Sequence, residues 1–185
     1  AAFNDDIGSW NVSQVTTMKN MFQSANAFNQ NIGAWDVSKV QNMDRMFGGA
    51  DAFNQDIGQW NVGNVTNMHG MFASADAFDQ DIGDWNTSQV TTMEGMFLGA
   101  GAFNKDIAKW NVTKVDTFED MFNSATNFNQ DITIWAPKVL PSSFNNMFQG
   151  ATQMQNTFGG NGNYGDTPQR AFFTLIGTFK PNNKS

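Results

Sequence analysis

The sequence predicts an α/β repeat solenoid in which each right-handed coil of 25 residues holds a short parallel strand and a two-turn helix. Its six tryptophans stand at positions 10, 35, 60, 85, 110 and 135, so that each is 25 residues from the next. Phenylalanine recurs with the same step at 3, 28, 53, 78, 103 and 128, and isoleucine at 7, 32, 57, 82, 107 and 132. One repeat cannot bury its own apolar face, but a stack of repeats buries that face as a continuous core.

A helix is expected at the Met-Phe pair of each repeat. Apolar residues in the first repeat follow the helical spacing i, i+3, i+4 and i+7, and they are Met18, Met21, Phe22 and Ala25. The residue before them, Thr17, is of a type whose side-chain oxygen caps a helix N-terminus. The equivalent positions hold Asn42, Asn67, Thr92, Thr117 and Ser143. Because a helix of two turns is marginal alone, it must pack against the rest of its coil.

The segment 28–32 is expected to form the short strand. Phe28 and Ile32 fall on one side of it, with polar residues between them. Gly33 permits a bend, after which Trp35 and Val37 alternate in a second extended segment. Neighbouring coils would then align their strands in a parallel ladder with a spacing of about 4.8 Å, joined by right-handed crossovers.

The 185 residues divide into two parts. Residues 1–151 hold six tandem repeats, and residues 152–185 hold a degenerate half repeat, a C-terminal cap and a tail. The apolar segment 171–176 is the predicted cap over the open end of the core. No N-terminal cap precedes Ala1, which indicates either a piece of a longer chain or a second subunit stacked at that end.

Composition excludes several classes of function. A net charge of −7 argues against nucleic acid and against an anionic membrane surface, because phosphates require a basic stripe. No run of about 18 apolar residues exists to cross a bilayer. The chain has no cysteine, and its single histidine, His69, stands at a variable position where a solvent-facing, idle side chain is expected. With no base to activate a nucleophile, we expect no enzyme.

The unit reads V-T-x-M-x-x-M-F-x-x-A-x-A-F-N-Q-D-I-G-x-W. It resembles the 25–26-residue surface-protein repeat of bacteria and mycoplasmas, which is grouped with the BspA-type leucine-rich repeats, and the resemblance covers about 150 of the 185 residues. The small residue that is often cysteine in relatives is alanine here, as at Ala25. The resemblance implies a leucine-rich-repeat-like coil and an extracellular or cell-surface protein, commonly an adhesive or interaction module, and it implies no catalysis.

Two polar columns are the candidate ligand face. Stacked asparagines often tie adjacent coils together, and we expect this role for one column while the other faces water. An exposed row of amides beside carboxylates binds a sugar or a peptide through adaptable hydrogen bonds. The ligand-face candidates are Asn29, Gln30, Asn54, Gln55, Asp79 and Gln80.

Two further columns admit alternative interpretations. Asp56, Asp81 and Asp106 are weak calcium candidates, since calcium prefers carboxylate oxygens, but they equally suit a turn in which the carboxylate accepts a backbone N–H. Asn31 in the same column favours the turn. The tryptophan column suits a sugar-stacking platform or, more readily beside the valine and isoleucine columns, a packed core.

The sequence thus predicts a non-catalytic extracellular or cell-surface recognition and adhesion module, which binds protein or carbohydrate through an exposed polar face. The alternative is a structural protein whose solenoids stack head-to-tail into a filament or sheath. No cofactor is expected apart from the calcium considered above, and neither nucleic acid nor direct membrane insertion is expected.

Overall fold

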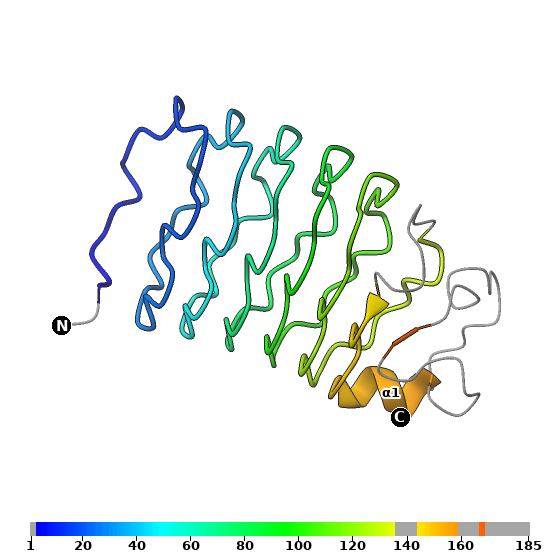
Figure 1. The fold of residues 1–185 in the computed structure, drawn as a ribbon. Helices are drawn as coiled ribbons and strands as arrows, with labels where there is room; N and C mark the ends of the chain where they lie inside the picture. The colour runs from blue at the N-terminus through cyan, green and yellow to red at the C-terminus, as the bar shows by residue number, and fades with distance from the viewer. Residues whose placement is uncertain (1–2, 136–143, 159–166, 169–185) are drawn as a thin grey trace.

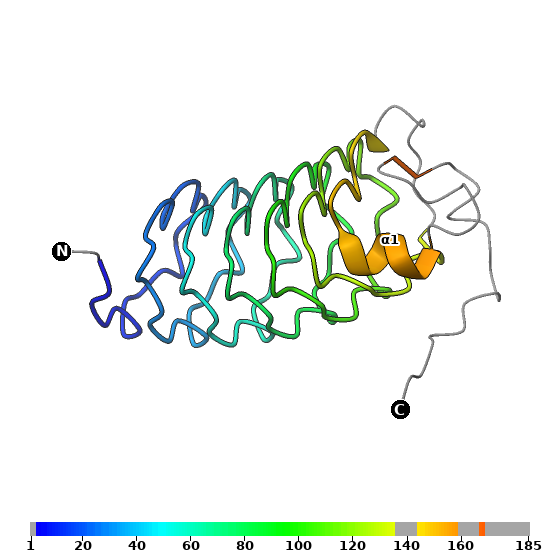
Figure 2. The same cartoon turned by 90° about the horizontal axis from the view of Figure 1, so that it is seen from below.

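The computed structural model describes residues 3–135, 144–158 and 167–168. The chain forms a row of similar coils stacked side by side, with the N-terminus at one end and the helix α1 at the other (Figure 1). Helix α1 spans Thr152–Phe158 and is the one regular helix of the described ranges. Seen from below, the coils follow one another along a single axis, and α1 lies against the last of them (Figure 2).

The predicted α/β solenoid is wrong. Within the described residues no strand forms, neither at 28–32 nor after the glycine bend, and no helix forms at the Met-Phe pairs. Neighbouring coils instead meet at isolated parallel bridges, which join Thr17 to Asn42, Asn42 to Asn67, Asn67 to Thr92, and Thr92 to Thr117. The leucine-rich-repeat-like coil, with its strands and two-turn helices, is therefore not supported.

The expected helices are replaced by what we call the turn ribbon, residues 18–25 and their equivalents. Alternate backbone N–H groups, at positions 18, 20, 22 and 24, donate to carbonyls of the next coil at 2.7–2.8 Å. The N–H groups between them close turns within the ribbon, as from Met21 to the carbonyl of Met18 at 3.1 Å. Asn20 and Ser24 have φ of 57° and 58°, in the left-handed region, where a right-handed helix cannot continue.

The residues expected to cap helices keep part of their predicted role. The Asn42 side-chain oxygen accepts the backbone N–H of Asp44 at 2.9 Å, and Asn67 does the same for His69. The bond supports a turn two residues long, after which the ribbon begins. The prediction that these residues cap helices is therefore wrong, although their side-chain oxygens do accept a backbone N–H two residues later.

The apolar columns form one continuous core. Phe47 and Phe53 of one coil stack at 3.9 Å between ring centroids, and Phe53 lies 5.9 Å from Phe28 of the coil before. Five tryptophans are only 2–4% exposed, namely Trp35, Trp60, Trp85, Trp110 and Trp135. The indole N–H of each donates to an isoleucine carbonyl of the preceding coil at 3.0–3.2 Å. The core interpretation is confirmed for these five, but Trp10 in the first coil is 54% exposed.

The last coil shows how the stack ends. In earlier coils the second N–H of the turn ribbon bonds a backbone carbonyl of the next coil, as from Asn20 to Asp44 at 2.8 Å. At the end the equivalent N–H of Asn146 donates to the Thr167 hydroxyl at 3.0 Å. Thr167 therefore supplies the acceptor that a further coil would have provided. The predicted cap segment, 171–176, and the tail lie outside the described residues.

Candidate functional site

A row of side chains that we call the amide ladder joins the coils on the polar face. It consists of Asn4, Asn29, Asn54, Asp79, Asn104 and Asn129. From Asn4 to Asn104, each Oδ1 accepts the backbone N–H of the ladder residue one coil later at 2.9 Å. Side-chain oxygens thus take the place of the backbone acceptors that a β ladder would use, which explains why no strand forms here. The predicted asparagine ladder is confirmed.

The expectation that the second polar column faces water is wrong for the glutamines, which reinforce the same contacts. Gln30, Gln55, Gln80 and Gln130 each donate from Nε2 to the ladder asparagine of the preceding coil at 2.8–3.1 Å. The six predicted ligand-face residues therefore all lie on the polar face, exposed or half-buried, with most of their amide groups bonded between coils. Their contact with a ligand stays a prediction.

One coil replaces the amides by an ion pair. Asp79 stands at the ladder position, and Lys105 stands at the glutamine position of the next coil. Lys105 Nζ lies 2.7 Å from Asp79 Oδ2, while Asp79 Oδ1 still accepts the N–H of Asn104. Here a carboxylate replaces one amide and an ammonium group replaces the other. The bond between the coils is kept, and the two charges balance.

The aspartate column shapes turns. Asp56, Asp81 and Asp106 accept the backbone N–H of the second residue after each of them at 2.8–3.0 Å. Asn31 does the same for Gly33 at 3.0 Å. The turn interpretation is confirmed. No group of three or more acidic or histidine side chains is placed to hold a metal ion in the described part of the chain.

The amide ladder stops at Asn129, and the reason lies in α1. The next residue of the column, Gln155, gives its backbone N–H to the Ala151 carbonyl inside the helix at 2.9 Å. Asn129 Oδ1 is consequently left without a partner, the one such buried side-chain atom in the described residues. A buried acceptor without a donor costs about 1–3 kcal/mol, so this atom marks a place where a donor is missing.

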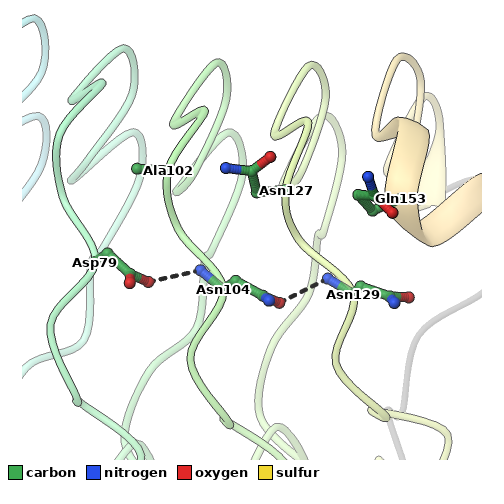
Figure 3. Close-up of a pocket in the computed structure, with 6 residues that line it drawn as sticks. All are labelled: Asp79, Ala102, Asn104, Asn127, Asn129 and Gln153. Carbon is green, nitrogen blue, oxygen red and sulfur yellow. Dashed lines mark hydrogen bonds between the residues drawn. The ribbon is translucent and has the colours of Figure 1, made fainter. Parts of the chain in front are cut away.

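Beside this unpaired atom lies what we call the polar groove, a hollow of about 380 Å³. Figure 3 shows its lining residues, which come from three successive coils and the start of α1. They are Asp79, Ala102, Asn104, Asn127, Asn129 and Gln153. Four of the six carry carboxamides, so the groove offers N–H donors and carbonyl acceptors together.

Asn127 and Gln153 were missed as site residues, although a signal for them exists. Their column holds alanine in the first five coils and changes to a carboxamide only in the last two. Both project beside the end of the ladder in Figure 3. A late change from alanine to a polar residue in a repeat column is therefore the feature that points to the groove.

A row of charges crosses four coils on the turn ribbon. Asp44, only 6% exposed, accepts from Lys19 Nζ at 2.8 Å and lies 2.9 Å from His69 Nδ1, while His69 Nε2 is 3.8 Å from Glu94. Burial acts to raise the pKa of Asp44, but the hydrogen bonds and positive charges of its two partners lower this pKa below its usual value. The expectation of an idle, solvent-facing His69 is wrong, because the side chain is 27% exposed and bonded.

Among the described helices, none has the length and apolar character needed to span a bilayer.

Stacked coils joined by a buried aromatic core and an amide ladder define a tandem-repeat protein. The chain belongs to the family described as Mycoplasma protein of unknown function, DUF285, which matches residues 1–81 and again residues 56–161. The two overlapping matches support the repeat organisation and the resemblance to a mycoplasma repeat, whereas the grouping with BspA-type leucine-rich repeats is not confirmed. No curated protein and no solved structure matches the chain.

Proposed function

We propose that this protein is a non-catalytic recognition module of the cell surface, which binds protein or glycan through the polar groove. The observation that carries the proposal is the unpaired Asn129 Oδ1 beside a groove rimmed by Asn127 and Gln153. Binding sites combine a concave shape with a few convergent polar groups. The groove has this form, and its lining stands on coils that hydrogen bonds join to one another.

The charges of the described residues favour a ligand that is not a polyanion. Each described lysine bonds to a side chain of an adjacent coil, as in the pairs Lys19–Asp44, Lys39–Gln14, Lys105–Asp79, Lys109–Asp84 and Lys114–Gln89. Basic side chains that are tied between coils do not form the free stripe that phosphate binding needs. Together with the net charge of −7, this supports an uncharged or weakly charged partner.

Arrays of peptides and glycans, probed with the full chain with and without a calcium chelator, test the proposal. We expect binding that Asn127→Ala weakens, because alanine occupies this column in five other coils and the fold tolerates it. Gln59→Ala, a change of an exposed amide in another coil, is the matched control and should bind as the parent does. Absence of binding to both arrays, or equal loss in both variants, contradicts the proposal.

A structural role in a filament or sheath is the second candidate. Exposed apolar side chains gather at the first coil, where Phe3, Trp10 and Met21 are 40%, 54% and 37% exposed. Phe3 and Met21 also line a hollow of about 620 Å³. Contact with another subunit would cover this surface. Mass measured across a concentration series separates the candidates, since growth with concentration favours the filament and a constant monomer mass contradicts it.

A further inference from the structure

We infer that the ligand of the polar groove is a short, uncharged saccharide, an inference that rests on the proposed function. The groove lies at the junction of the last coils with α1, where the amide ladder ends (Figure 3). Its lining supplies carboxamides and one balanced carboxylate, and Ala102 is its one apolar residue. Each of these features narrows the class of ligand.

The charge of the groove selects a neutral ligand. Asp79 is the one titratable residue among its six lining residues. Its carboxylate is already satisfied by Lys105 at 2.7 Å and by the N–H of Asn104 at 2.9 Å. A cationic ligand would have to displace Lys105, and an anionic ligand would meet a carboxylate with no free cation beside it. Neither sign of charge is favoured.

The unpaired acceptor requires a donor from the ligand. Asn129 lines the groove, and rotation of its carboxamide about the last side-chain bond, a torsion with broad minima, would bring the buried Oδ1 to the surface of the groove. A hydroxyl group there would donate to Oδ1. The same hydroxyl accepts from a neighbouring N–H, which the carboxamides of Asn127 and Gln153 provide. Sugar hydroxyls combine both roles on one atom, so they match a surface made of carboxamides.

A peptide fits this surface less well. Peptides bind by adding a strand to a sheet edge or by placing side chains in apolar pockets. The backbone N–H groups of Asn104 and Asn129 are already bonded within the ladder, so they form no free edge. Ala102 is the one apolar residue of the lining. A volume of about 380 Å³ is near the lower limit of ligand pockets, which suits a short saccharide.

The test uses the full chain and three sets of probes, namely neutral oligosaccharides, sialylated or sulfated oligosaccharides, and peptides. We expect binding to neutral oligosaccharides, with side-chain NH₂ signals of Asn127 and Gln153 shifting in NMR titrations. Asn127→Ala, Gln153→Ala and Asn129→Ala should each weaken binding about tenfold, the effect of one lost hydrogen bond. None of these changes removes a side-chain bond between coils, and Gln59→Ala is again the control.

Other outcomes separate this inference from the function on which it rests. Binding of peptides alone, weakened by Asn127→Ala, overturns the saccharide inference and supports the recognition module. Preference for charged oligosaccharides contradicts the inference that the ligand is uncharged, but it still supports the proposed recognition module. Saccharide binding that all three groove variants retain overturns the assignment to the groove. Binding to none of the probes contradicts both proposals.

Discussion

Each buried tryptophan joins two coils by two kinds of contact. Its ring packs among the phenylalanines, as Trp60 does at 6.3 Å from Phe47, and its indole N–H bonds the Ile32 carbonyl at 3.2 Å. The polar atom of the ring is thereby satisfied inside the core. The 25-residue spacing of tryptophan predicted this burial, because the valine and isoleucine columns beside it left no polar surface for a platform. Trp10 differs because no described coil precedes its own.

Replacing a buried and an exposed tryptophan of the same column by alanine shows how much of the effect on stability comes from burial. Trp60→Ala should lower the free energy of unfolding by about 3–5 kcal/mol, because it leaves a cavity and an unpaired carbonyl. Trp10→Ala should lower it by less than about 1 kcal/mol, since the side chain is 54% exposed. Chemical denaturation followed by circular dichroism measures both. Equal effects of the two changes would contradict the buried role of the column.

Asp44 makes the stability of the stack depend on pH. Its pKa is lowered in the folded state, so its stabilising contribution is present above the unfolded value near 3.8. The contribution is lost as the pH falls through the folded pKa, because protonation removes the charge that Lys19 and His69 stabilise. Denaturation midpoints measured from pH 6 to pH 2 should fall less steeply for Asp44→Asn than for the parent chain. A parental slope in Asp44→Asn would refute the assignment.

At the scale of elements, the turn ribbon explains why the spacing of the apolar residues predicted a helix that does not form. A succession of turns with bonds from residue i to i−3 places residues i, i+3, i+4 and i+7 on one side, as a helix does. Met43, Met46 and Phe47 are accordingly fully buried, as predicted. The residues that distinguish these turns from a helix lie between the buried ones in the sequence. One variable column holds Gly70 and Gly95, and another alternates serine with glycine, and both adopt positive φ. Such residues inside an expected two-turn helix favour left-handed turns instead.

The amide ladder was predictable from the sequence, but the point where it ends was not. Its period follows directly from the repeated asparagine. The groove depends on α1, whose internal hydrogen bonds take the Gln155 N–H away from Asn129. Asn129 and the α1 backbone thus compete for the Gln155 N–H. This competition exists only where α1 follows the last coil, so the sequence of a single repeat does not predict it.

One substitution at two positions of the ladder tests its energetic role. Asn54→Ala removes the acceptor of the Asp79 N–H and of Gln80 Nε2, and should cost about 1–3 kcal/mol of stability. Asn129→Ala removes an Oδ1 that bonds to nothing, so it should not lower the stability and should relieve part of the cost of the unpaired acceptor. Thermal and chemical unfolding measure both changes. A large loss in Asn129→Ala would mean that its amide has a structural partner, which would also weaken the case for the groove.

At the scale of the whole molecule, the bonds of the turn ribbon have a direction. The N–H groups that leave each ribbon point to the following coil, whereas a smaller set, such as Thr66 N–H to the Gln41 carbonyl, points back. Each coil therefore depends mainly on its two neighbours, as in other one-dimensional repeat stacks. The interior coils satisfy their ribbon donors through backbone carbonyls. In the final coil the ribbon donors need other acceptors, and among the described residues the Thr167 hydroxyl is one.

Thr167→Val, which keeps the shape and removes the acceptor, tests how the stack ends. The Asn146 N–H would lose its partner at 3.0 Å, so its hydrogen exchange should accelerate about tenfold, consistent with the loss of one hydrogen bond. Thr167→Ser retains the hydroxyl and should restore slow exchange. The Gly70 N–H, which bonds Glu94 in the interior, should be unaffected in both variants. Because each coil depends on its neighbours, faster exchange in the valine variant should be confined to the final coils. Uniform acceleration along the stack would show that the whole molecule opens as one unit, and unchanged exchange at Asn146 would exclude Thr167 as the terminal acceptor.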